Sequence, residues 1–167
     1  MCRFRSAVAV YQSESEVALK LLPGEDSHTK IREAFNIRVG LGAAASRQTP
    51  VEFVPFGALD DLDAYEFIFD AGKPNWWADV HTDSAVQQFR REVRGLLAEK
   101  TIEYDDDLYL GRVTTLPEGV TLKTGGNLYL NSVTTLPKGV SLEAGGEVYL
   151  AEHGWVTAAR AREILQA

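Results

Sequence analysis

The chain has 167 residues, 45% of them hydrophobic, which predicts a folded protein of one ordinary domain or two small ones. Its net charge of -7 argues against direct binding of nucleic acid, because that affinity depends on lysine and arginine side chains that displace counterions from phosphates. One cysteine, Cys2, excludes a disulfide scaffold, and no apolar run approaches the roughly 18 residues of a membrane span, so we expect a cytoplasmic protein without membrane contact.

Alternating polar and apolar residues at 2–12, followed by an apolar run at 17–22, predict a β-hairpin at the beginning of the chain. A short helix should follow the hairpin, capped by Asp26 or Ser27. The predicted apolar face of this helix consists of Ile31, Ala34 and Phe35.

Two further strands are expected at 51–56 and 64–69, on either side of an acidic turn. A long helix follows them, with Thr82 or Asp83 as its cap. Its apolar stripe has spacings of three and four residues and consists of Val86, Phe89, Val93, Leu96 and Leu97. This order predicts a small ββαββα domain over residues 1–100, with both helices on one face of the sheet.

Residues 101–150 repeat with a period of 20, since the segments "TIEYDDDLYL", "TLKTGGNLYL" and "SLEAGGEVYL" align without a gap. A fixed period of this length is typical of a stacked solenoid, and three copies predict three rungs. Strand-type alternation should point a leucine or valine inward and a tyrosine outward in each rung. Stacking would then align Tyr109, Tyr129 and Tyr149 in one column. We also expect a positive φ at the glycine pairs 125–126 and 145–146.

A closing helix is predicted after Gly154, with Thr157 as its cap and an apolar stripe that covers the last rung. Trp155 is expected either beneath this helix or at the surface as an interface anchor. The predicted fold class is therefore α+β: the ββαββα domain is fused to a three-rung β-solenoid, with its capping helix, over residues 101–167. The long helix of the first part runs directly into the first rung, which predicts one shared core.

The segments "LYLGRVTTLP" and "LYLNSVTTLP" resemble the leucine-rich repeat family in its short bacterial form. Val113 and Val133 stand where that family has asparagine, and Gly125 stands where it has leucine. These departures favour a generic small β-solenoid over a horseshoe. In either form the resemblance implies a surface for binding rather than catalysis.

The segments "FRSAVAV", "LLPGEDSHTKIREAF", "VEFVPF" and "AGKPNWW" resemble an uncharacterised family of small proteins from phages, prophages and bacteria, which carry this domain ahead of variable repeats. The resemblance covers roughly the first hundred residues and brings no activity that could be assigned to a residue. It implies a mobile-element context, in which small acidic proteins often block host defence complexes.

Candidate chemical sites are sparse in the sequence. His28, His81 and His153 lack metal-ligand spacing, and the serine and aspartate residues near two of them lack a nucleophile elbow. The segment "GLGAAA" at 40–45 matches a dinucleotide-binding pattern only nominally, since Pro50 interrupts the helix that such a site needs, and we expect a loop. We therefore predict no enzyme, no catalytic residues, no metal ligands and no cofactor.

Binding is the predicted activity. Residues 52–83 hold eight carboxylates against one lysine, which suits a basic protein or nucleoprotein complex as partner. The leading hypothesis is a non-enzymatic, anti-CRISPR-like inhibitor that occupies a basic nucleic-acid-binding surface of a host defence complex. The candidate partner-binding residues are Asp60, Asp61, Asp63, Glu66, Asp70, Trp76, Trp77, Asp79, Asp105, Asp106, Asp107, Tyr109, Tyr129 and Tyr149. At least one of the adjacent tryptophans is also expected in the core. The alternative is a structural module that self-associates, for example as a homodimer, through a solenoid edge or the tyrosine face.

Overall fold

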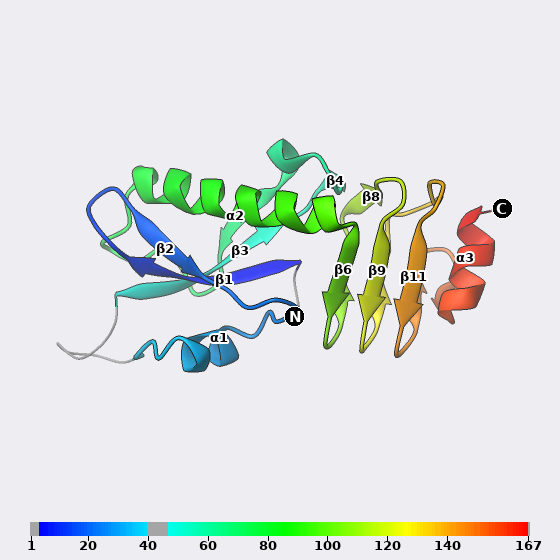
Figure 1. Ribbon diagram of the computed structural model, residues 1–167, viewed down its shortest axis with the longest axis horizontal. Coiled ribbons are helices and arrows are strands. Elements are labelled where there is room, and N and C mark those ends of the chain that lie inside the picture. The colour runs from blue at the N-terminus through cyan, green and yellow to red at the C-terminus, as the bar shows by residue number, and fades with distance from the viewer. Residues whose placement is uncertain (1–3, 40–46, 167) are drawn as a thin grey trace.

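The computed structural model describes residues 4–39 and 47–166 (Figure 1). Cys2 and the loop predicted at 40–45 lie outside these ranges. The described chain is a mixed α+β structure with three α-helices and strands in several sheets, as the sequence predicted in outline. None of the helices in these two ranges is both long enough and apolar enough to cross a bilayer.

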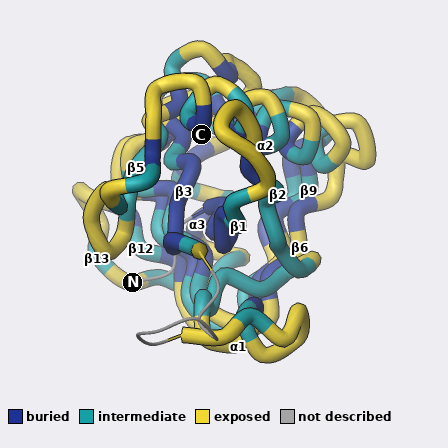
Figure 2. The backbone as a smooth tube through the Cα atoms, turned by 90° about the vertical axis from the view of Figure 1, so that its left-hand side faces the viewer, coloured by how far each residue is buried: buried dark blue, intermediate teal, exposed yellow. Residues whose placement is uncertain are grey.

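The first sheet is antiparallel and has the strand order β2-β1-β3-β5. Its strands are β1 (Arg5–Tyr11), β2 (Val17–Lys20), β3 (Gln48–Val54) and β5 (Glu66–Phe69). The two central strands, β1 and β3, are the most buried, and Figure 2 shows them in the interior, surrounded by exposed loops. The free edge of β2 is covered by side chains of the long helix, because Gln88 accepts from the Leu19 N–H and donates to the Val17 carbonyl.

The two helices of this part lie on opposite faces of the sheet: α2 (Asp79–Glu99) covers one face and α1 (His28–Ala34) the other (Figure 1). The prediction that both helices share a face was therefore wrong. The physical reason is visible in β1, whose residues 5–9 are all buried, so that the strand needs cover on both sides. Ala7 and Ala9 belong to the main hydrophobic cluster, whereas the fully buried Val8 and Ile31 do not.

The predicted cap of the short helix is confirmed, since the Ser27 hydroxyl accepts from the Lys30 N–H. Ala34 and Phe35 are exposed, so Ile31 is the only buried residue of α1. The long helix begins at Asp79, earlier than the predicted caps Thr82 and Asp83. The N-terminus of the helix is instead capped by the side chain of His81, whose Nδ1 accepts a hydrogen bond from the Ala78 N–H at 2.9 Å.

The 20-residue repeats form two sets of parallel strands. One set contains β6 (Thr101–Tyr104), β9 (Thr121–Thr124) and β11 (Ser141–Ala144), and the other contains β7 (Leu108–Tyr109), β10 (Leu128–Tyr129) and β12 (Val148–Leu150). Every pair joins residues 20 positions apart, as in Leu108, Leu128 and Val148. A further parallel pair, β4 (Gly57–Ala58) with β8 (Val113–Thr115), ties this region to the first hundred residues.

Glycines are required at two kinds of corner, for different reasons. Gly119 and Gly139, in the "LPEG" and "LPKG" turns, have φ values of 72° and 76°. Gly125 and Gly145 do not have positive φ, contrary to the prediction. A methyl group at Gly125 would overlap the Asp105 carbonyl oxygen, and one at Gly145 would overlap the Gly125 carbonyl oxygen. Close approach of successive repeats, not backbone conformation, therefore requires glycine there.

The closing helix α3 (Ala158–Gln166) packs on β11, as predicted, and buries Ala161 and Leu165. The Leu165 carbonyl accepts from the Leu136 N–H, and the Arg162 guanidinium donates to the Leu142 carbonyl. On the other sheet, β13 (Gly154–Val156) adds an antiparallel strand to β12. One hydrophobic cluster extends from Phe4 to Leu165, which confirms the predicted shared core.

Candidate functional site

Four aromatic side chains line up across the sheet β13-β12-β10-β7, and we call them the aromatic face: Tyr109, Tyr129, Tyr149 and Trp155. The rings of Tyr109 and Tyr129 are stacked with centroids 4.0 Å apart, and Tyr149 follows at 6.3 Å from Tyr129. The indole of Trp155 stands edge-on to both Tyr129 and Tyr149, at 5.1 Å from each. The predicted tyrosine column is thus confirmed, and it has a fourth member.

The aromatic face lies over a packed core, because the inward neighbours Leu108, Leu128 and Val148 are buried. The three tyrosines are half-buried, whereas Trp155 is 44% exposed. Of the two positions expected for Trp155, the one beneath the closing helix is wrong. The chain reverses after β12, and the antiparallel register places Trp155 opposite Tyr149.

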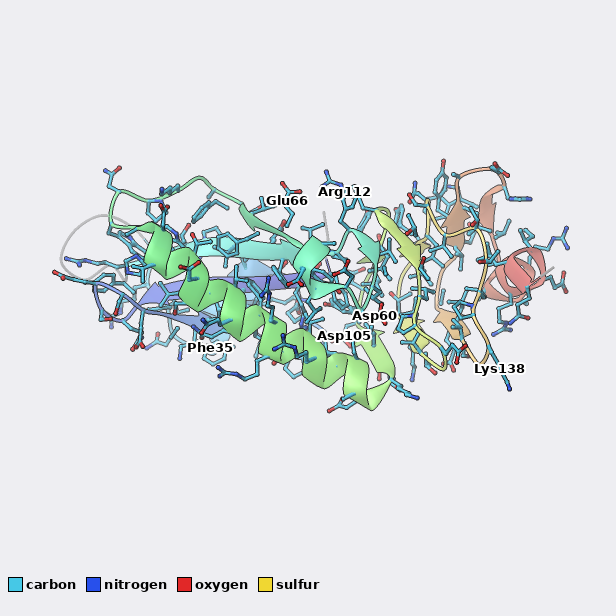
Figure 3. The ribbon with its side chains drawn as sticks, turned by 90° about the horizontal axis from the view of Figure 1, so that it is seen from above. Phe35, Asp60, Glu66, Asp105, Arg112 and Lys138 are labelled. Atoms are coloured by element: carbon cyan, nitrogen blue, oxygen red, sulfur yellow. The ribbon has the colours of Figure 1, made fainter. Side chains whose placement is uncertain are left out.

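The acidic residues of segment 52–83 are distributed over several surfaces. Asp60, Asp61 and Asp63 lie together around the short 3-10 helix η1 (Leu62–Ala64). Their charge is partly offset by α2, since Arg90 forms an ion pair with Asp63 at 3.1 Å. The exposed pair of Glu66 and Arg112, at 3.0 Å, lies on another part of the surface (Figure 3). The segment therefore does not form one uninterrupted acidic patch.

The adjacent tryptophans differ in position. Trp77 is only 5% exposed, packs against Phe67 and Phe69, and donates from Nε1 to the Thr82 hydroxyl. It belongs to the core, as expected for at least one of the two tryptophans, and its partner-binding role stays a prediction that this burial does not favour. Trp76 is half-buried, with its ring 5.4 Å from that of Tyr11. Asp79 is exposed at the first position of α2.

The aspartates at 105–107 form the corner between β6 and β7. Asp105 and Asp106 are exposed. The Asp107 carboxylate accepts from the Asn127 N–H at 2.7 Å, and the Asn127 side-chain oxygen accepts in the same way from the Glu147 N–H at 2.8 Å. Asp107 thus joins successive repeats, whereas Asp105 and Asp106 are exposed at the corner and Asp106 also faces the α1 side of the molecule.

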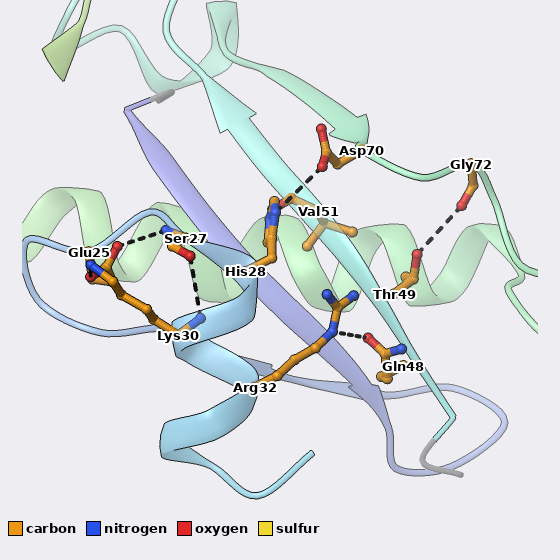
Figure 4. Close-up of polar contacts among 10 residues, drawn as sticks. All are labelled: Glu25, Ser27, His28, Lys30, Arg32, Gln48, Thr49, Val51, Asp70 and Gly72. Carbon is orange, nitrogen blue, oxygen red and sulfur yellow. Dashed lines mark hydrogen bonds and ion pairs between the residues drawn. The ribbon is translucent and has the colours of Figure 1, made fainter. Parts of the chain in front are cut away.

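A second site, which the sequence did not predict, is a hollow of about 440 Å³ on the α1 side of the sheet. We call it the His28 hollow, and it is lined by Glu25, Asp26, Ser27, His28, Lys30, Glu52, Asp70 and Asp106. Figure 4 shows its polar contacts: Glu25 accepts from the Ser27 N–H and pairs with Lys30 at 3.1 Å. Burial opposes ionisation of Glu25, but these contacts outweigh it and lower its pKa.

His28, Glu52 and Asp70 meet in this hollow, with one potential ligand atom of each within 4.8 Å of the others. His28 Nε2 lies 3.4 Å from the Val51 carbonyl oxygen, and Nδ1 lies 3.5 Å from the Asp70 carboxylate. Glu52 is 3% exposed. Burial lowers the pKa of His28, although the Val51 carbonyl and Asp70 act in the opposite direction, so the neutral imidazole is favoured.

The sequence does not reveal this cluster, because its members come from a helix, a strand and a strand end that are 18 or more positions apart. The available signal was Glu52 itself, a carboxylate between the apolar residues Val51 and Phe53 of β3. Comparison of the chain with models of protein families, with curated proteins and with solved structures finds no match in any of the three.

Proposed function

We propose that this chain is a non-enzymatic binding protein that docks its aromatic face onto a basic surface of another protein. The observation that carries the proposal is the arrangement of Tyr109, Tyr129, Tyr149 and Trp155 in one row on a sheet backed by buried leucine and valine. Tyrosine and tryptophan are enriched at the centres of protein interfaces, where a rigid ring contributes area at small entropic cost.

A basic partner is favoured by charge. The chain has a net charge of -7, and the exposed Asp105 and Asp106 lie in the corner that leads into the strand of Tyr109. Complementary charge would accelerate association and make it sensitive to salt. Together with the resemblance of the first hundred residues to small phage-type proteins, this favours inhibition of a host defence complex by occupation of its nucleic-acid-binding surface.

We further propose that the three repeats act as a short β-solenoid scaffold for this face. Parallel pairing at a constant offset of 20 residues supports this architecture. A generic solenoid is favoured over a leucine-rich horseshoe, since each of the three repeats consists of short strands and turns without a helix.

The aromatic face is tested by a double variant, Tyr149→Ser with Trp155→Ser, compared with Phe35→Ser. Phe35 is also an exposed aromatic residue, at 41%, but it follows α1 at the other end of the molecule (Figure 3). A partner is first captured from the native host with the wild-type chain, then purified, and its affinity for each variant is measured by calorimetry. We expect the double variant to bind at least about tenfold more weakly and the control to bind like the wild type. Equal affinity of wild type and double variant would refute the proposal.

A second candidate is self-association through the same face. It is favoured by the solvent exposure of Trp155 at the end of the row, and β2 and β11 are poor alternatives because α2 and α3 cover them. Sedimentation velocity distinguishes the two functions. A discrete dimer that Trp155→Ser abolishes would favour self-association, whereas a monomer throughout the micromolar range would exclude it.

A further inference from the structure

We propose that His28, Glu52 and Asp70 form a binding site for a divalent transition metal ion, with Zn²⁺ as the preferred ion. An imidazole nitrogen and two carboxylates are a donor set that Zn²⁺ uses in proteins. Their potential ligand atoms lie within 4.8 Å of one another. A tetrahedral Zn²⁺ with bonds of 2.0–2.2 Å holds neighbouring ligand atoms about 3.4 Å apart, and the His28 Nδ1 and Asp70 oxygen are separated by 3.5 Å.

The hydrogen bonding of His28 orients the ring for a metal. The Val51 carbonyl can only accept, so Nε2 carries the proton that it shares with this carbonyl. In the neutral ring Nδ1 then has a lone pair, and this lone pair faces the carboxylate of Asp70. Two acceptors in contact repel each other unless a proton or a cation lies between them. Histidine ligands in metalloproteins commonly donate their second N–H to a backbone carbonyl in this manner.

The electrostatics of the His28 hollow favour a cation. Five carboxylates line it, from Glu25, Asp26, Glu52, Asp70 and Asp106, against the single lysine Lys30. Lys30 is engaged by Glu25 at 3.1 Å. In addition, the Asp26 oxygen Oδ2 is buried and has no hydrogen-bond donor among the described residues. A buried carboxylate oxygen without a donor is costly, and a bound cation nearby would reduce that cost.

The position of the three ligands indicates what the ion would do. His28 belongs to α1, Glu52 to β3, and Asp70 directly follows β5, so one ion would join the helix to two strands. The side chain of Asp70 is 47% exposed, which provides a path for the ion and leaves a coordination position open to water. None of the three proposed ligands belongs to the aromatic face, although Asp106 lines the hollow as well.

The test uses the purified full chain, stripped of metal with a chelator that is then removed. ZnCl₂, MnCl₂ and MgCl₂ are titrated separately, with calorimetry and thermal unfolding as readouts. We expect one Zn²⁺ per chain with a dissociation constant in the micromolar range or below, and a melting temperature that rises with Zn²⁺ concentration. Binding should be weaker for Mn²⁺ and undetectable for Mg²⁺ at the same concentration. Absence of saturable 1:1 binding of Zn²⁺ would overturn the proposal.

The variants are His28→Gln and Asp70→Asn, with His153→Gln and Asp60→Asn as matched controls at exposed positions outside the hollow. Each site variant should lower Zn²⁺ affinity at least about tenfold, and neither control should change it more than about twofold. Asp70→Asn keeps the test valid if His28→Gln fails to fold, since the Asp70 side chain is half exposed. Nitrogen NMR of the wild type should show that Zn²⁺ changes Nδ1 of His28. Unchanged affinity in Asp70→Asn, or an unchanged His28 signal, would contradict the assignment.

Discussion

The guanidinium of Arg5, in the first strand of the central sheet, donates a hydrogen bond to the carboxylate of Glu92 in α2. Arg5 is 1% exposed, and its second described partner, the hydroxyl of Tyr104, lies at 3.5 Å. A buried arginine remains charged, so its free energy depends on the carboxylate beside it. This pair connects the sheet, the long helix and the first repeat at one point.

Replacing Glu92 with Gln should lower the free energy of unfolding by about 2–4 kcal/mol, because the charge of Arg5 would then stay buried without its counterion. Chemical denaturation monitored by circular dichroism measures this change. The matched control is Glu163→Gln, which removes the exposed i,i+3 pair with Arg160 and should cost less than about 0.5 kcal/mol. Similar effects of the two substitutions would show that the Arg5 pair is not a strong interaction.

Substitution of alanine at Gly145 should destabilise the repeats by about 1–3 kcal/mol, because the added methyl group overlaps the carbonyl of Gly125 in the preceding repeat. The same change at Gly95, within α2, meets no atom within 4 Å and should stabilise the protein by about 0.5–1 kcal/mol. Thermal unfolding of both variants gives the comparison. If Gly145→Ala is neutral, the repeats do not approach each other as closely as described.

Alkaline pH should destabilise the protein through two buried tyrosines. Burial raises the pKa of Tyr104 to about 12, although the nearby Arg5 opposes this effect, and burial also raises the pKa of Tyr65. Between pH 10 and 12 the unfolded chain loses the phenol proton of Tyr104 while the folded protein retains it. The free energy of unfolding should therefore fall as pH rises, by up to about 1.4 kcal/mol per pH unit for Tyr104.

The double variant Tyr65→Phe with Tyr104→Phe should have a shallower dependence of unfolding free energy on pH in this window. Denaturation at several pH values from 9 to 12 measures the slope. Tyr129→Phe is a suitable control, since it removes a phenol from the half-buried aromatic face. Parallel curves for the double variant and the wild type would refute this assignment.

Charge reversal should show which of two exposed acidic groups, Asp105 with Asp106 or Asp60 with Asp61, contacts the partner. Asp105→Lys with Asp106→Lys, at the corner between β6 and β7, should weaken binding to the proposed basic partner at least about tenfold at low salt and by less at high salt. The same reversal of Asp60 and Asp61, which lie by η1 and the arginines of α2, should change the affinity less than about twofold. Surface plasmon resonance at two salt concentrations provides the comparison. A larger effect at Asp60 and Asp61 would locate the partner there instead.

Much of the fold could be predicted because the signals were local. The 20-residue period specified which residues pair across the repeats, and strand alternation specified that Tyr109 and its counterparts point outward. Ser27 could be identified because a cap acts within one turn of its own helix. The side of the sheet on which α1 lies could not be predicted, since Ile31 alone forms its buried contact and the burial of Val8 depends on tertiary packing.

The sites were predicted less completely, for the same reason. The position of Trp155 depends on the reversal of the chain after β12, which makes β13 antiparallel to it. The burial of Trp77 depends on its packing against Phe67 and Phe69 of β5. The contact between His28 and Asp70 brings together residues that no periodicity relates. Asp107 was predicted as a partner-binding surface residue. Its carboxylate accepts a hydrogen bond from the Asn127 N–H, and this contact depends on how the repeats stack.

The constant offset of 20 residues has a consequence for how such a chain can vary. A tandem duplication of residues 121–140 would fit between its neighbours, because each copy offers the same pairing register to the next. Both ends of the molecule would stay as they are, while the array would grow by about 4.8 Å and gain one ring per copy. Unequal recombination could therefore lengthen or shorten the aromatic face by whole 20-residue repeats. The sequence of each repeat would stay the same.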